Sequence, residues 1–259
     1  MYLTDFTEKA FLNTLNNIKM IAPQDVYLGL FLNDPTDTGA GGIEISYSGY
    51  ERQKVVFSEP TLQANTVAMH NMALISFSKS DREVGTVQYV GFFNSKNGGN
   101  MLAYGKLTEE LAIGIDEAPT ILDKEIVFSL SLDLSQAYKT KLLNYFRGQS
   151  IEGFAPHMAL YNGSPDRGGS EITGSLYERV ALSFTTPSDE PTGYSAIKLN
   201  ADAKFNKPPD DWGVFNHFVI YDDAMNGEPV FIKQRSVERR LLKGHTVIFE
   251  VDSVVVAIN

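Results

Sequence analysis

Gly42-Ile43-Glu44-Ile45 and Tyr50-Glu51-Arg52 return later in the chain as Gly169-Ser170-Glu171-Ile172 and Tyr177-Glu178-Arg179. The Glu-Ile and Tyr-Glu-Arg elements are separated from their counterparts by the same interval, which is nearly half of the chain. A repeat of this length indicates a duplicated domain, because the units of solenoid proteins are only about 20–50 residues long. The sequence therefore predicts two copies of one fold in tandem.

The similarity between the two copies continues on both sides of these motifs. Four further pairs of segments match: residues 11–13 with 142–144, 85–93 with 213–221, 97–99 with 225–227, and 126–128 with 247–249. The interval between matching segments shortens along the chain, as expected when insertions and deletions collect in loops. We therefore divide the chain near residues 132–135 into two predicted domains, 1–133 and 134–259. Each is long enough for a hydrophobic core of its own.

The composition is that of a globular protein, and it restricts the possible partners. Hydrophobic residues make up 43% of the chain, and no run of about 18 apolar residues exists that could cross a membrane. The first residues lack the basic and apolar regions of a signal peptide, which predicts a soluble protein made in the cytosol. The net charge of −10 argues against nucleic acid as a partner, because phosphate binding needs a basic surface. The absence of cysteine excludes disulfides, thiolate metal sites and cysteine nucleophiles.

Each copy is expected to begin with an amphipathic helix. Near the start of the chain, apolar residues recur at roughly helical spacing, and Asp5 with Glu8 resembles a capping box. In the second copy, Ser135 is the expected N-cap and Gly148 the expected stop signal.

The rest of each copy has the pattern of β structure. Short apolar segments at 26–31 and 158–161 end in clusters of turn-forming residues, and segments 52–57 and 179–184 show partial alternation. Many short strands separated by Gly, Pro and Asn turns predict a mainly β fold. We expect two tandem β-sandwich units, jelly-roll-like, each preceded by its N-terminal amphipathic helix.

The order of these motifs resembles that of a family of tailed-bacteriophage virion structural proteins, often labelled tail fibre or minor structural proteins. A unit of that family looks like a helix followed by an LFxxDPxDxG segment, a Glu-Ile or Glu-Val pair, a YxRQ strand and a Gly-Gly turn. The first copy matches this pattern over nearly its full length, at Leu30, Phe31, Asp34, Pro35, Asp37, Gly39, Glu44, Tyr50, Arg52, Gln53, Phe57, Gly98, Gly99, Leu102 and Gly105. The second copy departs from it, with Ser164 in place of Asp34, Val180 in place of Gln53, and Pro229 in its closing turn region.

The resemblance implies a non-enzymatic virion protein, made in the host cytoplasm, that assembles in multiple copies. Its place would be the tail, neck or collar, baseplate or fibre-attachment region. Its partners would be other virion proteins and further copies of itself in a symmetric assembly, without nucleic acid or membrane insertion. No catalytic residue, cofactor or metal is carried over from the resemblance.

Two alternatives stay open beside this interpretation. One is a capsid decoration or head-fibre protein. The other is a carbohydrate-binding host-adhesion module that would bind a host-surface glycan through exposed aromatic rings such as Trp212, Tyr221 and Tyr104.

The candidate structural or interface residues are six that both copies share: Tyr50, Arg52, Tyr177, Arg179, Glu44 and Glu171. Residues two apart in a strand point to the same face, so the tyrosine and the arginine of each copy are expected side by side. We expect the tyrosine to pack at a sheet edge and the arginine to bind a loop carbonyl or the nearby glutamate. The alternative is an interface hot spot, where tyrosine and arginine are over-represented.

Other polar groups support weaker hypotheses. Asp34, Asp37 and Gly39 form either a calcium loop or, as we favour, a turn capped by aspartate side chains. The acidic pairs at 210–211 and 222–223 lie beside aromatic residues and could bind a sugar or a metal, but solvated loops are the favoured interpretation.

Neither histidines nor catalytic motifs point to an enzyme. The four histidines are scattered without metal-ligand spacing. No P-loop, Gly-x-Ser-x-Gly or Gly-x-Gly-x-x-Gly motif follows a strand. A basic stretch at Lys233, Arg235, Arg239, Arg240 and Lys243 is interpreted as a strand surface that balances nearby carboxylates. A docking patch for an acidic neighbour is the alternative.

Overall fold

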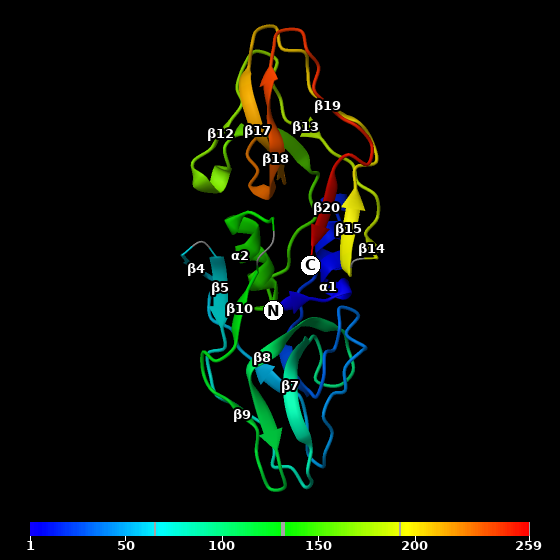
Figure 1. Ribbon diagram of the computed structural model, residues 1–259, viewed down its shortest axis with the longest axis vertical. Helices are drawn as coiled ribbons and strands as arrows, with labels where there is room; N and C mark the ends of the chain where they lie inside the picture. The colour runs from blue at the N-terminus through cyan, green and yellow to red at the C-terminus, as the bar shows by residue number, and fades with distance from the viewer. Residues whose placement is uncertain (65, 131–132, 192, 259) are drawn as a thin grey trace.

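The computed structural model describes residues 1–64, 66–130, 133–191 and 193–258, which form an elongated, mainly β molecule (Figure 1). The first copy contains helix α1 (Asp5–Leu12), the 3-10 helix η1 (Asn13–Asn16) and strands β1 (Tyr2–Leu3), β2 (Val26–Phe31), β3 (Gln53–Val55), β4 (Thr61–Gln63), β5 (Thr66–His70), β6 (Ile75–Ser76), β7 (Gly85–Phe93), β8 (Met101–Ile113), β9 (Thr120–Ile121) and β10 (Val127–Ser129). The second copy contains α2 (Gln136–Tyr145), the 3-10 helix η2 (Pro165–Arg167) and strands β11 (His157–Asn162), β12 (Ser170–Glu171), β13 (Val180–Ala181), β14 (Ser188–Glu190), β15 (Tyr194–Lys198), β16 (Ala203–Lys204), β17 (Gly213–Tyr221), β18 (Pro229–Leu241), β19 (Ile248–Phe249) and β20 (Val255–Ile258).

The strand order of the first copy is repeated in the second except for one edge strand of each five-stranded sheet. The first copy has a five-stranded sheet in the order β1-β8-β7-β2-β3, a three-stranded sheet β10-β5-β4, and the pair β6-β9. The second has a five-stranded sheet in which β12-β11-β17-β18 are joined by β13 on β11, a three-stranded sheet β14-β15-β20, and the pair β16-β19. The exceptions are β1, which pairs with β8, and β12, which pairs with β11; in the other copy each of these places holds only an isolated β-bridge. The remaining strands occupy matching places, as expected of a duplicated fold.

The last strand of each copy corrects the sequence alignment. The sequence equates residues 126–128 with 247–249, but β10 pairs with β5 whereas β19 pairs with β16. The true counterpart of β10 is β20, because Phe128 lies opposite Met69 in the first copy as Val256 lies opposite Ile197 in the second. The predicted shortening of the interval at the end of the chain is therefore wrong. Both candidate segments are short and apolar, and only the pairing partner distinguishes them.

The sheets are small and antiparallel, so the predicted mainly β class is confirmed but the predicted pair of jelly-roll sandwiches is not. The chain is mainly β, but its strands do not form two clear jelly-roll sandwiches, because each copy has one five-stranded sheet and two smaller ones. One helix, α1, lies at the N-terminal end of the chain, whereas α2 lies in its middle. Turn signals and alternation locate strands, but the sheet that a strand joins depends on pairing between distant residues.

The two helices begin in different ways. Ser135 is the N-cap of α2, as predicted, and its Oγ accepts a hydrogen bond from the first helical turn at 3.1 Å. The N-cap of α1 is Thr4 rather than Asp5, and the Thr4 hydroxyl donates to the carbonyl oxygen of Met101 at 2.6 Å. The predicted capping box is therefore wrong, because Glu8 directs its carboxylate into the second copy instead. Within the described ranges, no helix is long and apolar enough to cross a membrane.

Each helix packs against the three-stranded sheet of the other copy (Figure 1). Helix α1 lies against β15, and the backbone N–H of Ser195 donates to Glu8 Oε2 at 2.8 Å. Helix α2 lies against β5, and the ring of Phe146 meets the ring of Phe128 with centroids 4.7 Å apart. The helices therefore connect the two copies. Residues 131 and 132, at the predicted domain boundary, lie outside the described part of the chain.

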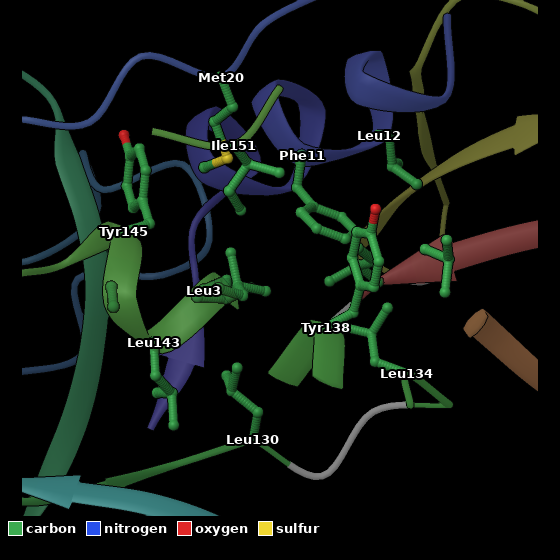
Figure 2. Close-up of a cluster of buried hydrophobic side chains, with 14 of the residues drawn as sticks. Leu3, Phe11, Leu12, Met20, Leu130, Leu134, Tyr138, Leu143, Tyr145 and Ile151 are labelled. Atoms are coloured by element: carbon green, nitrogen blue, oxygen red, sulfur yellow. The ribbon is translucent and has the colours of Figure 1, made fainter. Parts of the chain in front are cut away.

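One cluster of buried hydrophobic side chains runs through both copies. At the junction, Phe11 of α1 lies edge-on to Tyr138 of α2 and to Phe231 of β18, with ring centroids 6.2 Å apart in both cases. Figure 2 shows Phe11 beside Tyr138, with Leu3 and Leu143 in the same cluster. The copies thus share a core, whereas the sequence predicts a separate core for each.

Candidate functional site: paired glutamate–tyrosine–arginine clusters

The side chains of Glu44, Tyr50 and Arg52 meet in one cluster, which we call the first clamp. Arg52 donates from Nε to Glu44 Oε1 at 2.8 Å and from Nη2 to Glu44 Oε2 at 2.7 Å, which is the strong bidentate arrangement. The Tyr50 hydroxyl donates to Glu44 Oε1 at 3.1 Å and accepts from the backbone N–H of Leu30 at 2.9 Å. Both oxygens of the Glu44 carboxylate are therefore bound within the protein.

Local structure explains why these three residues meet beside β2. The loop after β2 turns back so that Glu44 forms an isolated β-bridge with Phe31. Arg52 directly precedes β3, the strand that pairs with β2 on the same side. Gly29 in β2 leaves room for the carboxylate, because a Cβ at this position would lie 2.7 Å from Glu44 Oε1.

The first clamp also reaches the turn between β7 and β8. Arg52 Nη1 donates to the carbonyl oxygen of Gly98 at 2.7 Å and to that of Ser95 at 3.3 Å. Glu44 belongs to the loop after β2, and Arg52 to the segment that enters β3. The guanidinium therefore ties three separate segments together.

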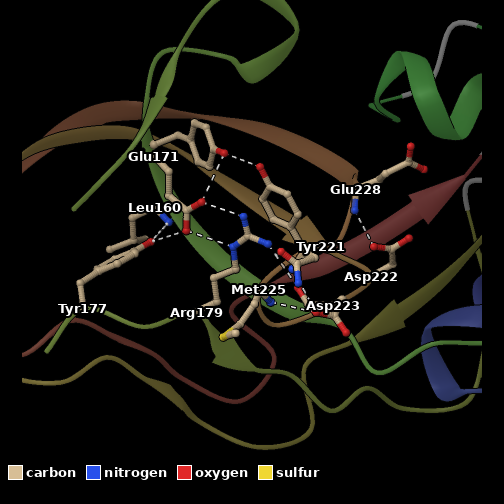
Figure 3. Close-up of polar contacts among 11 residues, drawn as sticks. Leu160, Glu171, Tyr177, Arg179, Tyr221, Asp222, Asp223, Met225 and Glu228 are labelled. Atoms are coloured by element: carbon tan, nitrogen blue, oxygen red, sulfur yellow. Dashed lines mark hydrogen bonds and ion pairs between the residues drawn. The ribbon is translucent and has the colours of Figure 1, made fainter. Parts of the chain in front are cut away.

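The second clamp repeats this arrangement with Glu171, Tyr177 and Arg179 (Figure 3). Arg179 donates from Nε to Glu171 Oε1 at 3.0 Å and from Nη2 to Glu171 Oε2 at 2.8 Å. The Tyr177 hydroxyl accepts from the backbone N–H of Leu160 at 2.9 Å and donates to Glu171 Oε1 at 3.4 Å. Arg179 Nη1 reaches the carbonyl oxygen of Asp223, in the turn between β17 and β18, at 3.2 Å.

An aromatic ring lies against the guanidinium in each clamp. Arg52 Cζ is 3.2 Å from the ring centroid of Phe93, and Arg179 Cζ is 3.4 Å from that of Tyr221. A cation over a ring face is attracted by the ring quadrupole. Sequence reasoning missed these two rings. The available signal is that Phe93 and Tyr221 end the matched strands β7 and β17.

Both ion pairs are largely withdrawn from water. The arginine side chains are 12% exposed in both clamps, and those of Glu44 and Glu171 are 25% and 22% exposed. Burial raises the pKa of Tyr50 and of Tyr177, and the neighbouring glutamate raises it further. Both hydroxyls therefore remain protonated and continue to donate. A buried charge that loses its partner is costly, so the intact clamps stabilise the loops that they join.

The first clamp also borders a pocket of about 360 Å³, which Glu51, Lys96 and Asn97 help to line. One edge of the Tyr50–Arg52 segment therefore faces the surface. The geometry of the clamps is suited to holding loops in place, because their charged atoms are directed toward each other and toward backbone carbonyls.

The aspartates considered for a calcium loop accept hydrogen bonds from within the protein, Asp34 from its own turn and Asp37 from strand β8. Asp34 Oδ1 accepts from the backbone N–H of Thr36 at 2.8 Å, the geometry of the favoured capped turn, and Asp37 Oδ1 accepts from the Tyr104 hydroxyl at 2.8 Å. Among the residues that the structure describes, no group of three or more His, Asp or Glu side chains is arranged to hold a metal.

The acidic pairs of the second copy order turns. Asp211 Oδ1 accepts from the backbone N–H of Lys243 at 2.9 Å. Asp222 Oδ1 accepts from Glu228 N at 2.6 Å, and Asp223 Oδ1 from Met225 N at 2.9 Å (Figure 3).

The aromatic residues considered as sugar-binding platforms are buried. Trp212, Tyr221 and Tyr104 are 7%, 5% and 7% exposed. The Trp212 indole N–H donates to the carbonyl oxygen of Ser175 at 3.2 Å. These rings therefore pack in the interior and present no exposed stacking surface.

The basic stretch is only partly balanced by carboxylates. Lys233 forms an ion pair with Asp133. Arg239, Arg240 and Lys243 are exposed, and within the described ranges none of them forms an ion pair. A direct ion pair therefore supports the predicted balance by nearby carboxylates at Lys233, and for the rest of the stretch it stays a prediction.

Comparison with known protein families accounts for the repeated architecture. The model of a family described as "Podophage GP4 fiber I protein gp80" matches residues 2–129 and again residues 133–257. No curated protein matches the chain. The two family matches cover nearly the whole chain and confirm both the internal duplication and the resemblance to phage fibre proteins. The chain belongs to the gp80 family of podophage GP4 fiber I proteins, and is thus a member of a family of bacteriophage virion fibre proteins.

Proposed function

We propose that the chain is a non-enzymatic structural subunit of a virion that assembles in multiple copies in the tail, neck or collar, baseplate or fibre-attachment region. The observation that carries this proposal is the match of a single fibre family to both copies, combined with the single hydrophobic cluster that joins them. A protein that connects virion parts has to keep its two ends in a fixed relationship. A shared core does this better than a flexible linker between separate domains.

Within this function, the six clamp residues have a structural role. Glu44 with Tyr50 and Arg52, and Glu171 with the same two residue types in the second copy, hold the loops around the five-stranded sheets. Loops that are tied at several points present a constant surface to neighbouring virion proteins, and preorganised surfaces lose less entropy on binding.

The division at residues 133 and 134 fits this role as a boundary between two structural units. Each unit has its own set of sheets, and the helix of each unit packs against the three-stranded sheet of the other. Two units of similar fold in one chain offer loops at matching positions to an assembly.

Purified particles provide the test of this proposal. Mass spectrometry of intact particles establishes whether the chain is present, and immunogold labelling with an antibody against it establishes where. Label at the tail, neck, baseplate or fibre bases supports the proposal. Label over the capsid shell instead indicates a decoration or head-fibre protein, and absence from clean particles overturns a virion role.

Two controls keep the labelling interpretable. An antibody against the major capsid protein labels the shell in the same preparation, and pre-immune serum gives the background. Heads separated from tails then show which fraction retains the chain.

A further inference from the structure

The two longest hairpins of the molecule end at opposite ends of its long axis (Figure 1). Hairpin β7–β8 ends with Gly85 paired to Ile113, and β17–β18 ends with Gly213 paired to Leu241. We call residues 78–87 with 107–120 the acidic tip, and the matching residues 206–215 with 235–248 the basic tip. The two hairpins pair in the same register, so each position of one tip has a counterpart in the other.

The two tips carry opposite net charge. The acidic tip has six acidic residues against two basic ones: Asp81, Glu83, Glu109, Glu110, Asp116 and Glu117 against Lys79 and Arg82. The basic tip has five basic residues against three acidic ones: Lys207, Arg235, Arg239, Arg240 and Lys243 against Asp210, Asp211 and Glu238. The basic tip is notable because the whole chain has a net charge of −10.

These charges are displayed to solvent instead of being neutralised within the molecule. Glu109, Glu110, Arg239 and Arg240 are all exposed, and within the described residues none of them forms an ion pair. Arg235 differs from the other charged residues of the tips because its side chain is half-buried near the ring of Phe215. Burial lowers the pKa of Arg235, and the nearby positive charge of Arg239 lowers it further.

The charge difference arises at matching positions of matching strands. Arg239 and Arg240 occupy the places in β18 that Leu111 and Ala112 occupy in β8. The two tips also present an exposed apolar side chain each: Ile115 is 63% exposed in the acidic tip, and Val237 is 68% exposed in the basic tip. The fold is the same at both ends, and the surface chemistry is complementary.

We propose that the acidic tip of one molecule docks onto the basic tip of a second molecule of this chain, so that molecules associate head to tail. Contact between two identical tips would bring like charges together, which costs free energy. Opposite tips attract, and the exposed apolar side chains add buried area to the contact. A head-to-tail contact is heterologous, so repetition gives a ring where the rotation closes and a filament where it does not.

Sedimentation velocity of the full chain tests this contact by charge reversal. Glu83→Arg with Glu109→Arg and Glu110→Arg makes both tips basic, and Arg239→Glu with Arg240→Glu makes both tips acidic. We expect the wild-type chain to self-associate at low ionic strength and to dissociate as salt screens the tips. Each reversed variant alone should lose self-association by about ten-fold or more. A mixture of the two variants should associate again, because each supplies the tip that the other lacks.

A chain that carries all five reversals is the decisive variant, since its tips have exchanged sign and should attract as in the wild type. Asp123→Arg with Glu178→Arg and Glu250→Arg is the matched control, with the same change in net charge as the acidic-tip reversal at exposed positions outside the tips. Circular dichroism verifies that each variant is folded. A monomeric wild-type chain at low salt, or association that does not respond to the tip reversals, overturns the proposal. Neither result depends on the place of the chain in a virion. Sedimentation can therefore overturn this contact without affecting the proposed function, and particle labelling can overturn the proposed function without affecting this contact.

Discussion

Met20 and Ile151 are joined by two reciprocal backbone hydrogen bonds, in which each N–H donates to the carbonyl oxygen of the other residue, at 2.8 and 2.9 Å. The interval between these two residues equals the interval between the first residues of α1 and α2. They are therefore equivalent positions in the two copies. The two copies therefore meet at equivalent positions here, as they do where α1 packs on β15 and α2 on β5.

The shared core predicts that the two copies unfold together. Phe11→Ala removes a ring from the junction between α1, α2 and β18 and should cost about 3–5 kcal/mol. Trp212 is the only tryptophan and lies in the second copy, so its fluorescence reports on that copy alone. We expect the substitution in the first copy to shift the Trp212 transition and the far-ultraviolet circular dichroism transition by the same amount in urea.

Leu62→Ala, at a side chain that is 56% exposed, is the control and should leave both transitions nearly unchanged. If Phe11→Ala splits the unfolding curve and leaves the Trp212 transition in place, the two copies have separate cores.

In the first clamp, removing one member of the ion pair should destabilise the protein more than removing both members. Arg52→Met leaves Glu44 as a largely buried carboxylate that keeps Tyr50 but loses its charged partner, and should destabilise the protein by about 2–3 kcal/mol. Adding Glu44→Leu removes the orphaned charge and should recover a large part of this loss. Denaturation of the two variants and the wild type measures the difference.

The exposed pair of Lys19 and Glu152, with side chains 49% and 75% exposed, is the comparison for the clamp. Lys19→Ala should cost less than about 1 kcal/mol. Equal costs for Lys19→Ala and Arg52→Met would show that the clamp contributes no more than a surface ion pair.

Gly29→Ala tests the space that the first clamp needs. The added Cβ would lie 2.7 Å from Glu44 Oε1, so the carboxylate has to move away from Arg52, at an expected cost of about 1–3 kcal/mol. A double-mutant cycle with Glu44→Ala should show strong coupling, because the clash disappears with the carboxylate. Additive free energies of unfolding in this cycle would contradict the proposed clash. Ala159 occupies the matching place in the second copy, and Ala159→Gly should not couple to Glu44.

Glu8 predicts a pH dependence of stability. Burial raises its pKa from 4.5 to about 7, and Oε1 has no hydrogen-bond partner among the described residues. The folded state therefore binds this proton more tightly than the unfolded state does. The contribution of Glu8 to stability is present below a pH of about 4.5 and is lost as the pH rises through about 7.

Glu8→Gln removes this ionisation and keeps an acceptor for the N–H of Ser195. The variant should match the wild type near pH 4.5 and exceed its stability by up to about 3 kcal/mol at pH 8. Thermal or urea denaturation at both pH values measures the difference, with Glu178→Gln at an exposed position as the control. A constant difference across this range would mean that Glu8 does not titrate between the two values.

Much of the candidate site was within reach of sequence reasoning. The shared Glu44, Tyr50 and Arg52 pattern is local, because all three residues lie close together in the chain. Repetition in the second copy identified them as a unit. The aromatic rings against the arginines come from β7 and β17, much further along the chain, and no local pattern connects them to the clamp.

The sequence by itself determined that this protein is a tandem duplication of a mainly β unit, and it identified the residues of both clamps and the family. These conclusions rest on similarity between segments and on short-range periodicity, which a linear chain displays directly. Only the tertiary structure decided that β20 is the counterpart of β10, that Glu8 points into the other copy, that each helix packs on the neighbouring sheet, and that the oppositely charged tips lie at opposite ends. Each of these features depends on contacts between residues far apart in the chain, where the partner that is geometrically available decides among segments of similar composition.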